Sequence, residues 1–356
     1  MSVTDSTILA KAEAFFLERV QPNAQRIDLD PDALREVLDE MGRQELLALR
    51  RPVAFGGPEI SELAFREFQE MSARYSGSLS FLMTQHQSAV SMLAKSDNEA
   101  LKAEYLPLMG DGRKLSGIGF SQLRRPGPPI MRAEPVEGGY RLEGEVPWIT
   151  GWTFYHEFLI GATLPDGRAV FGFVPFSPTP EITFSEPMRL AAMESPQTVS
   201  ATIAGHFLPS SQVAFVREAG WAQKNDMINI VLQGHFAFGC AQAGIDIVRQ
   251  ASEKKGLAFI GDAASALQVE LDACRAAAAK IPSGMDSEVS EEKLKLRAWA
   301  IDLASRCGHA AIAASSGAAN SLQHPAQRVY REALVYTVSA QTPDIMRATL
   351  ERLVGR

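Results

Sequence analysis

The stretch GGYRLEGEVPWIT, residues 138–150, marks a change in the texture of the chain. Before about Leu115, apolar residues recur at helical spacing, whereas around this stretch short apolar runs alternate with Pro- and Gly-rich turns, as strands do. Residues 158–164 and 168–174 are two such runs, and the Pro165-Asp166-Gly167 segment between them predicts a β-hairpin. The middle of the chain is therefore expected to be a β domain of antiparallel barrel or sandwich architecture.

Helices are expected before this β domain. Asp30 followed by Pro31 predicts a helix start, because an aspartate accepts from first-turn amides and proline lacks only an N–H that the first turn does not use. We expect this helix to end at Gly42 in a left-handed conformation. Further helices are expected from the apolar spacing at 8–20, 63–75, 80–93 and 96–110.

Helices return after the β domain and continue to the C-terminus. Residues 225–255 predict one long helix that Gly256 ends, and a last helix is expected over 327–353 after the break at His324-Pro325. An Ala-rich helix over 263–281, ended by Pro282-Ser283-Gly284, and a helix capped by Ser290 complete a predicted four-helix bundle. The expected fold class is α+β, mainly α, with an N-terminal helical bundle at 1–113, a β domain at 114–218 and a C-terminal four-helix bundle at 219–356.

Composition narrows the function classes. The 356 residues include 35 Lys and Arg and 42 Asp and Glu, so the formal net charge is −7. An acidic balance argues against nucleic-acid binding, which needs a basic surface. No stretch is apolar enough to cross a bilayer and the N-terminus lacks a signal-peptide pattern, so we expect no membrane partner and a cytoplasmic location. The three cysteines lie far apart without metal-site spacing, so no metal is expected.

The order of helices, β domain and helices at this length resembles the acyl-CoA dehydrogenase superfamily of FAD flavoproteins. Residues 138–150 are similar to the family's G-x-x-Y-x-L-x-G-x-K-x-W-I-T segment, and EYLPLM at 104–109 is similar to its YLP-L helix end. AFGGP at 54–58 and QRVYREA at 327–333 resemble two further family stretches. The resemblance covers essentially the whole chain and implies an FAD-dependent oxidoreductase acting on a CH–CH group of an acyl thioester, such as an acyl-CoA, or of a related substrate.

This resemblance implies three cofactor-binding residues. Trp148 and Thr150 stand in the segment that packs against the flavin and reaches its N5/O4 side, and Ser121 stands where a family hydroxyl meets the pyrimidine end. A flat apolar ring with a polar edge needs such aromatic contacts and hydroxyl donors. For Trp148 and Thr150 the alternative is an ordinary strand pair with a buried Trp and an exposed Thr. For Ser121, a site role and a purely structural role both stay open.

The chain departs from the family at the catalytic base. Most of the family place a Glu in an E-G-T-x-E stretch after the last helix's R-D-A, but Ala340 stands at that place here. A minority place the base on the first long helix of the C-terminal bundle, where this chain has Asn229. Neither Ala340 nor Asn229 accepts a proton from carbon, so the catalytic residue is unknown.

Cofactor retention also departs from the family pattern. The family holds the FAD diphosphate and adenine with an R-x-x-F-G segment from a neighbouring subunit, whereas the stretch EKKGLAF at 253–259 lacks the Arg and has no F-G pair. Lys254 and Lys255 are candidate phosphate partners, with an exposed helix end as the alternative. Arg124 and Arg125 follow Ser121, where they either face an anionic ligand group or are solvated. FAD is therefore expected to be weakly held, in a homodimer or homotetramer, because the family's pocket spans two subunits.

Two alternatives stay open. The run HPAQRVYRE at 324–332 is similar to one in flavin-dependent monooxygenases of the same fold, which accept reduced flavin from a partner flavin reductase and need no α-proton base. FMN would then be the cofactor, and His86 is a candidate to line the cleft, with a structural hydrogen-bonded role as its alternative. The second alternative is a non-catalytic descendant that keeps the fold as a binding module.

Overall fold

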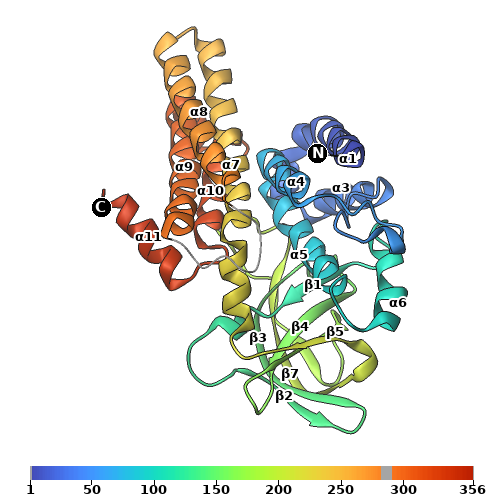
Figure 1. Cartoon of the computed structure of the whole chain (residues 1–356). Coiled ribbons are helices and arrows are strands. Elements are labelled where there is room, and N and C mark those ends of the chain that lie inside the picture. The colour runs from blue at the N-terminus through green and yellow to red at the C-terminus, as the bar shows by residue number, and fades with distance from the viewer. Residues whose placement is uncertain (1, 282–290, 356) are drawn as a thin grey trace.

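The computed structural model describes residues 2–281 and 291–355 (Figure 1). Its first part consists of helices, as the sequence predicts. Asp30 begins α3 by accepting a hydrogen bond from the Asp32 amide at 2.9 Å. The bounds of the helices are α1 Val3–Phe15, α2 Ala24–Leu29, α3 Pro31–Arg43, α4 Glu62–Tyr75, α5 Gly77–Leu93 and α6 Glu99–Met109.

The predicted end of α3 at Gly42 is wrong. The helix continues to Arg43, and Gly42 does not have a positive φ. A Cβ atom at Gly42 would lie 2.7 Å from the carbonyl oxygen of Asp111, so the glycine is needed for close packing rather than for a turn.

The middle of the chain forms one eight-stranded sheet in the order β6-β7-β3-β2-β4-β5-β8, with β1 beside β4. The predicted hairpin is β4 and β5. Antiparallel pairing holds as predicted for most neighbours, but β4 runs parallel to β1 and, at one position, to β2. The reason is that the β2–β3 hairpin lies between β1 and β4 in the chain, and a parallel pair needs such a long connection. The bounds are β1 Ser116–Gly119, β2 Met131–Val136, β3 Gly139–Thr150, β4 Glu157–Thr163, β5 Ala169–Pro175, β6 Ile182–Phe184, β7 Thr198–Pro209 and β8 Val213–Arg217.

The C-terminal part is the predicted helical bundle (Figure 1). Helices α7, α8, α9 and α10 pack together, and α11 packs on α9 at the edge of the bundle. The single last helix predicted over 327–353 is wrong: Thr342 caps a new helix that begins with Pro343. The predicted cap Ser290 and the predicted stop at 282–284 lie outside the described residues. The bounds are α7 Trp221–Lys255, α8 Ala258–Ala279, α9 Glu291–Ser315, α10 Pro325–Val338 and α11 Pro343–Leu353.

Two large hydrophobic cores hold these parts together. One is shared by the N-terminal helices and the sheet and includes Phe16, Phe68 and Phe158. The other lies within the C-terminal bundle and includes Phe238 and Leu303. Helix α7 packs against α4 and also contacts the 3₁₀ turn η4, Ser121–Arg124, beside the sheet, so it joins all three parts. The division into domains at 1–113, 114–218 and 219–356 stays a prediction.

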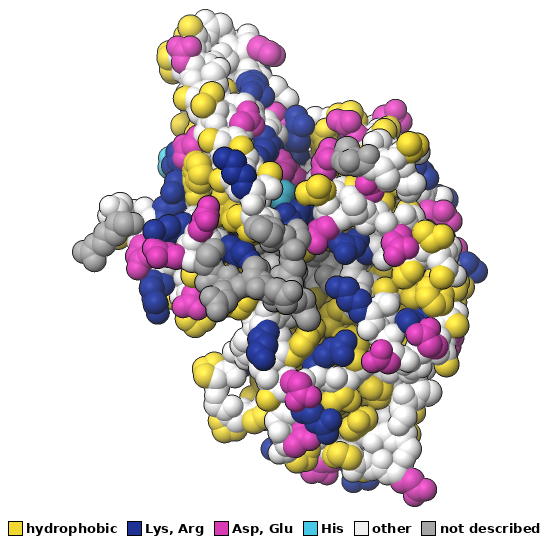
Figure 2. All heavy atoms as spheres, viewed as in Figure 1, with side chains coloured by type: hydrophobic (Ala, Val, Ile, Leu, Met, Phe, Trp, Pro, Cys, Tyr) yellow, Lys and Arg dark blue, Asp and Glu magenta, His cyan; other side chains and the backbone are white. Residues whose placement is uncertain are grey.

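The surface carries charges of both signs. Figure 2 shows Lys and Arg side chains interspersed with Asp and Glu over the visible face. Within residues 2–281 and 291–355, no helix is both long and apolar enough to span a bilayer.

Candidate functional site

The three predicted cofactor residues lie on strand β3 and on turn η4, two elements that contact each other. Strand β1 packs across β3. The two strands are close enough that a Cβ atom added at Gly119 would lie 3.2 Å from Cγ1 of Val146. Turn η4 follows β1 directly and contacts β3. The structure therefore brings Ser121, on η4, to the strand that carries Trp148 and Thr150.

A β-bulge lies in β3 close to the side chains of Trp148 and Thr150. The register between β3 and β7 shifts between Val146 and Ile149, which re-aims the side chains there. Trp148 is 49% exposed, whereas Thr150 is 6% exposed and shares a 2.9 Å hydrogen bond with the Thr198 hydroxyl. The burial expected under the strand-pair alternative, a buried Trp and an exposed Thr, is reversed in the structure, while Thr150 does pair with Thr198 across the strands. The half-exposed indole leaves a flat apolar surface on β3.

Two buried polar atoms on η4 have no hydrogen-bond partner. They are the hydroxyl oxygen of Ser121 and Oε1 of Gln122. The amide nitrogen of Gln122 donates to the carbonyls of Gly119, at 3.2 Å, and Gly161, at 2.8 Å, so only its oxygen is unused. Buried polar atoms are nearly always paired, by protein, water or ligand. These two atoms therefore mark η4 as a place where a further hydrogen-bonding group fits.

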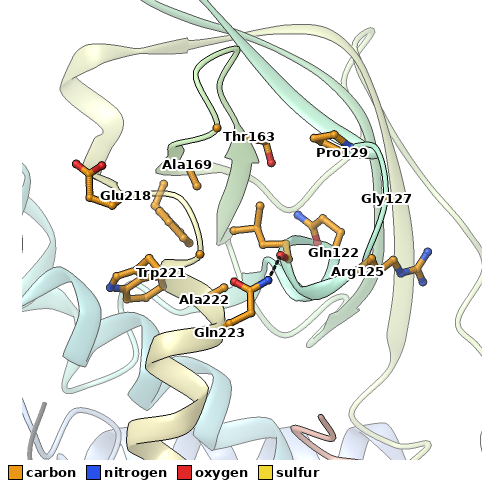
Figure 3. A pocket seen from close by; sticks show the side chains of 14 residues that line it. Gln122, Arg125, Gly127, Pro129, Thr163, Ala169, Glu218, Trp221, Ala222 and Gln223 are labelled. Carbon is orange, nitrogen blue, oxygen red and sulfur yellow. Dashed lines mark hydrogen bonds between the residues drawn. The ribbon is translucent and has the colours of Figure 1, made fainter. Parts of the chain in front are cut away.

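A cavity of about 180 Å³ lies beside η4, between the β4–β5 hairpin and the first turn of α7. Figure 3 shows Trp221 and Gln223 on its α7 side and Gln122 on its η4 side. The Gln223 amide donates to the Leu123 carbonyl at 3.1 Å, which ties the helix to the turn. The side chain of Arg125 points away from the cavity. Gln122 thus adds an unused acceptor to a small, partly apolar hollow.

The two arginines after Ser121 have different surroundings. Arg124 makes a bidentate ion pair with Asp226 of α7, at 2.5 and 2.7 Å. Its guanidinium is therefore committed to α7, and the prediction that it faces an anionic ligand is not met in this structure. Arg125 is exposed.

Helix α7 also carries a second tether, seven residues further on. Arg297 of α9 donates from Nη1 to the Gln233 carbonyl at 2.6 Å, and from Nη2 to the carbonyls of Tyr336 and Ser339 at 3.0 and 3.3 Å. Seven residues correspond to about 10 Å along a helix. The N-terminal half of α7 therefore contacts η4 and is linked through Arg297 to the turn at 339–342, and we take these elements, with the end of β3, as the candidate site.

The turn at 339–342 offers no carboxylate at position 340. Ala340 has a left-handed φ of 51°, and Oε1 of the neighbouring Gln341 is buried without a hydrogen-bond partner. On α7, the amide of Asn229 donates to the Asn225 carbonyl at 2.8 Å. Both positions at which the family resemblance places a base therefore lack one in the folded chain as well.

His86 has a structural role. Its Nε2 bonds the Met109 carbonyl at 2.9 Å, and its Nδ1 accepts from the Ser116 amide at 3.1 Å, which fits the neutral tautomer with the proton on Nε2. Desolvation by complete burial lowers the pKa of His86 to about 4. A ring that is enclosed and doubly bonded to backbone holds β1 against α5 and α6.

The charged residues of the 324–332 run also form structural contacts. Glu332 is fully buried and accepts from the Gly77 amide at 3.0 Å and from Arg328 at 2.7 Å. Arg331 donates to the buried Asp28 at 2.5 Å. Burial raises the pKa of Glu332, and Arg328 opposes that change. This network ties α10 to α2 and α5, and it uses only Oε1 of Glu332, whose Oε2 is buried without a partner.

One of the predicted phosphate partners is used in a helix cap. Nζ of Lys255 donates to the Ala314 carbonyl at 2.6 Å and bonds the Ser316 hydroxyl at 2.8 Å, at the C-terminal end of α9. Lys254 is exposed at the end of α7. In the part of the chain that the structure describes, no group of three or more His, Cys, Asp or Glu side chains is arranged to hold a metal ion.

Sequence reasoning missed three residues of this site: Gln122, Arg297 and Gln341. The unpaired oxygens of Gln122 and Gln341 depend on tertiary packing and have no sequence signal. Arg297 has one, because it is a charged residue inside the apolar run LRAWAI of α9.

Residues 3–113 match the family described as acyl-CoA dehydrogenase, N-terminal domain. The mitochondrial isovaleryl-CoA dehydrogenase of Pongo abelii is 22% identical, over 95% of this chain and 85% of that protein. The benzylmalonyl-CoA dehydrogenase of Aromatoleum aromaticum is 24% identical, over 95% of this chain and 94% of that protein.

Solved structures share the fold over the whole chain. The butyryl-CoA dehydrogenase of Megasphaera elsdenii superposes with a TM-score of 0.82 at 17% identity, covering 99% of both chains. KijD3 in complex with FMN and a dTDP-linked amino sugar superposes with a TM-score of 0.77 at 18% identity, covering 100% of this chain and 95% of that one. An acyl-CoA dehydrogenase of Bacillus anthracis complexed with FAD superposes with a TM-score of 0.80 at 17% identity, covering 100% of this chain and 68% of that one, so structures of this fold contain different flavins.

Proposed function

We propose that this chain, a member of the acyl-CoA dehydrogenase superfamily by its N-terminal domain and its fold, is a flavin-dependent oxidoreductase. Its substrate would be an acyl thioester or a related compound that is oxidised at a CH–CH group. The proposed cofactor is FAD, the proposed assembly a homodimer or homotetramer, and the proposed location cytoplasmic.

The observation that carries this proposal is the unpaired Ser121 hydroxyl on η4, a turn that contacts β3, the strand on which the indole of Trp148 is half-exposed. A flavin ring presents a flat apolar face and a polar edge, and these two groups match both features. Thr150, held by Thr198, would add a hydroxyl at the same edge. When bound, a flavin would serve as the hydride acceptor. The residues of this chain bind and orient the ring.

The chain's own residues do not supply the α-proton base in the usual place, since position 340 is an alanine. Proton abstraction by a positioned carboxylate contributes roughly 10²–10⁴-fold to such reactions. We therefore expect acyl-CoA to reduce the bound flavin slowly in the natural chain. A two-component flavin-dependent monooxygenase, with FMN and a flavin reductase as partner, is the second candidate, because that reaction needs no α-proton base. A non-catalytic descendant is the third.

Flavin retention is the first test. The purified protein would be incubated with FAD or FMN, desalted, and examined for the visible flavin bands. We expect FAD to bind, and W148L to weaken binding about tenfold through the lost aromatic contact. The matched control is F207L, because Phe207 is also 49% exposed on the same sheet but faces no proposed ligand. Equal affinities for W148L and F207L would contradict the assigned site.

The reaction is tested on the loaded protein. Anaerobic bleaching of the flavin by members of an acyl-CoA panel supports the dehydrogenase proposal. Substrate-dependent oxygen consumption with reduced FMN or FAD, without such bleaching, supports the monooxygenase. A protein that retains neither oxidised nor reduced flavin is the non-catalytic descendant.

A further inference from the structure

Arg297 is a buried cation whose hydrogen bonds all go to backbone. Its side chain is 2% exposed, and among the described residues no carboxylate pairs with it. Burial lowers the pKa of Arg297 to about 10, which still leaves the guanidinium charged at neutral pH. Burying a charge is costly unless its surroundings compensate, so this position calls for a physical reason.

Part of the reason is the end of α10. The carbonyls of Tyr336 and Ser339 belong to the last turn and the cap of that helix, where carbonyls lack helical partners and the helix dipole is negative. A cation at this place is favourable. Nη1 of the guanidinium donates to the Gln233 carbonyl in the N-terminal half of α7, and Nε has no partner. One planar group thus fixes the end of α10 against α7.

The turn that follows is held in an unusual conformation. Ala340 has a left-handed φ, which a non-glycine residue rarely adopts unless its surroundings impose it. Arg297 fixes the turn on one side of Ala340, and the Thr342 hydroxyl, which accepts from the Ile345 amide at 3.3 Å, fixes it on the other. Between them, the side-chain oxygen Oε1 of Gln341 is buried without a hydrogen-bond partner. The fold therefore holds an unused hydrogen-bond acceptor in a turn of imposed shape.

We propose that Arg297 is a positioning residue, which fixes the 339–342 turn on α7 so that Gln341 meets the bound flavin or its substrate. This inference rests on the flavin-dependent function proposed above. Arg297 touches no ligand itself and acts through the turn. The same stretch of α7 holds η4 through Asp226, seven residues before Gln233, so one helix carries both tethers.

The test compares R297M with R306M, since Arg306 lies on the same helix but is exposed and is paired with the carboxylates of Glu270 and Asp302. Two readouts are taken well below the melting temperature: amide hydrogen exchange of the peptide over 336–345, and the dissociation constant for FAD. In R297M we expect about tenfold faster exchange confined to this peptide and about tenfold weaker FAD binding, with neither change in R306M. R297K, which keeps the charge but not the planar fork, should lie between. It also replaces R297M as the test variant if R297M does not fold.

Three outcomes overturn the proposal. Exchange that is unchanged over 336–345 shows that Arg297 does not hold the turn. Exchange that rises equally over the whole C-terminal bundle shows a general stabilising role. Faster local exchange with unchanged FAD affinity shows that the turn does not serve the site. If the natural chain binds no FAD, the proposed function fails. The role of Arg297 is then decided by hydrogen exchange over 336–345, measured with and without reduced flavin or members of the acyl-CoA panel and judged by the three outcomes above.

Discussion

Position 340 offers a direct chemical test, because one side chain separates the structure from the base that the family resemblance implies. Ala340 already has a left-handed φ, so a glutamate there adds little backbone cost. We predict that A340E, loaded with FAD, is reduced anaerobically by an acyl-CoA about 100-fold faster than the natural chain, since a positioned carboxylate contributes roughly 10²–10⁴-fold. Stopped-flow absorbance of the flavin band measures this rate.

The control for this prediction is A340Q, which has the same shape without the basic oxygen. The gain in A340E should increase with pH as the new carboxyl ionises, and A340Q should show no gain. Equal rates in the two variants would mean that the turn does not face the reacting carbon, and would favour the monooxygenase.

His86 gives a prediction about acid stability. Its pKa is about 4 in the folded chain and about 6.5 when unfolded, so the unfolded state binds more protons between these values and stability falls as the pH falls. At pH 5, which is about 1.5 units below the pKa of the unfolded state, this effect lowers the free energy of unfolding by about 2 kcal/mol. It is nearly absent at pH 7 and above. We predict that the difference in unfolding free energy between pH 7 and pH 5 is about 2 kcal/mol smaller in H86Q than in the natural chain.

Chemical denaturation at the two pH values measures this difference. H156Q is the control, because His156 also accepts a backbone N–H, from Leu115 at 3.0 Å, but is exposed. The prediction does not hold if H86Q and the natural chain lose equal stability on acidification.

At the scale of elements, the network on α10 predicts a large stability effect. Removing Glu332 leaves the Arg328 guanidinium buried without its partner and the Gly77 amide without its acceptor. We predict that E332A lowers the free energy of unfolding by about 3–5 kcal/mol, whereas E351A, at an exposed glutamate of α11, changes it by less than about 0.5 kcal/mol. Urea denaturation measures both values.

The double variant R328M/E332L refines this test. Because apolar replacement of both partners leaves no unpaired charge, its cost should be well below that of E332A plus R328M. A loss in E332A as small as that in E351A would show that the network does not hold α10 to the N-terminal helices.

The sequence predicted elements well where the signal was local. The Pro-Asp-Gly turn predicted the β4–β5 hairpin, and Asp30-Pro31 predicted the start of α3. Predictions failed where distant contacts decide: Gly42 was assigned to a turn but is required by the Asp111 backbone. The division between α10 and α11 had a local signal, Thr342 before Pro343, but the apolar spacing on both sides concealed it.

The site follows the same rule. Local motifs and resemblance named Ser121, Trp148 and Thr150, which lie on two elements in contact, η4 and β3, and their cofactor role stays a prediction. The exposure of Trp148 depends on a β-bulge, which the strand pattern does not show. The tethers from Arg124 and Arg297 to α7 join segments more than 60 residues apart, and only the folded chain shows them.

At the scale of the whole molecule, the outer helices of the bundle carry exposed apolar stripes. Tyr330, Leu334 and Val338 recur at every fourth residue of α10 and are 45–58% exposed. On α11, Met346, Leu350 and Leu353 are 49–62% exposed, and Figure 1 shows this helix at the edge of the bundle. Stripes of this kind typically mark contacts between proteins. We infer that a second copy of the chain covers them.

Two stripes allow the dimer and the tetramer to be distinguished by mutation. We predict that the natural chain sediments at two or four times 38.7 kDa. L350E/L353E and L334E/V338E should each disrupt one interface, converting a tetramer to a dimer or a dimer to a monomer, because a buried carboxylate without a partner is costly. L63E is the control, at a leucine of α4 that is 61% exposed outside the bundle. Because the family resemblance places the FAD diphosphate between subunits, the variant that loses the dimer should also lose FAD. A monomeric natural chain that still retains FAD would show that one copy holds the whole cofactor, with the exposed stripes free for a different partner.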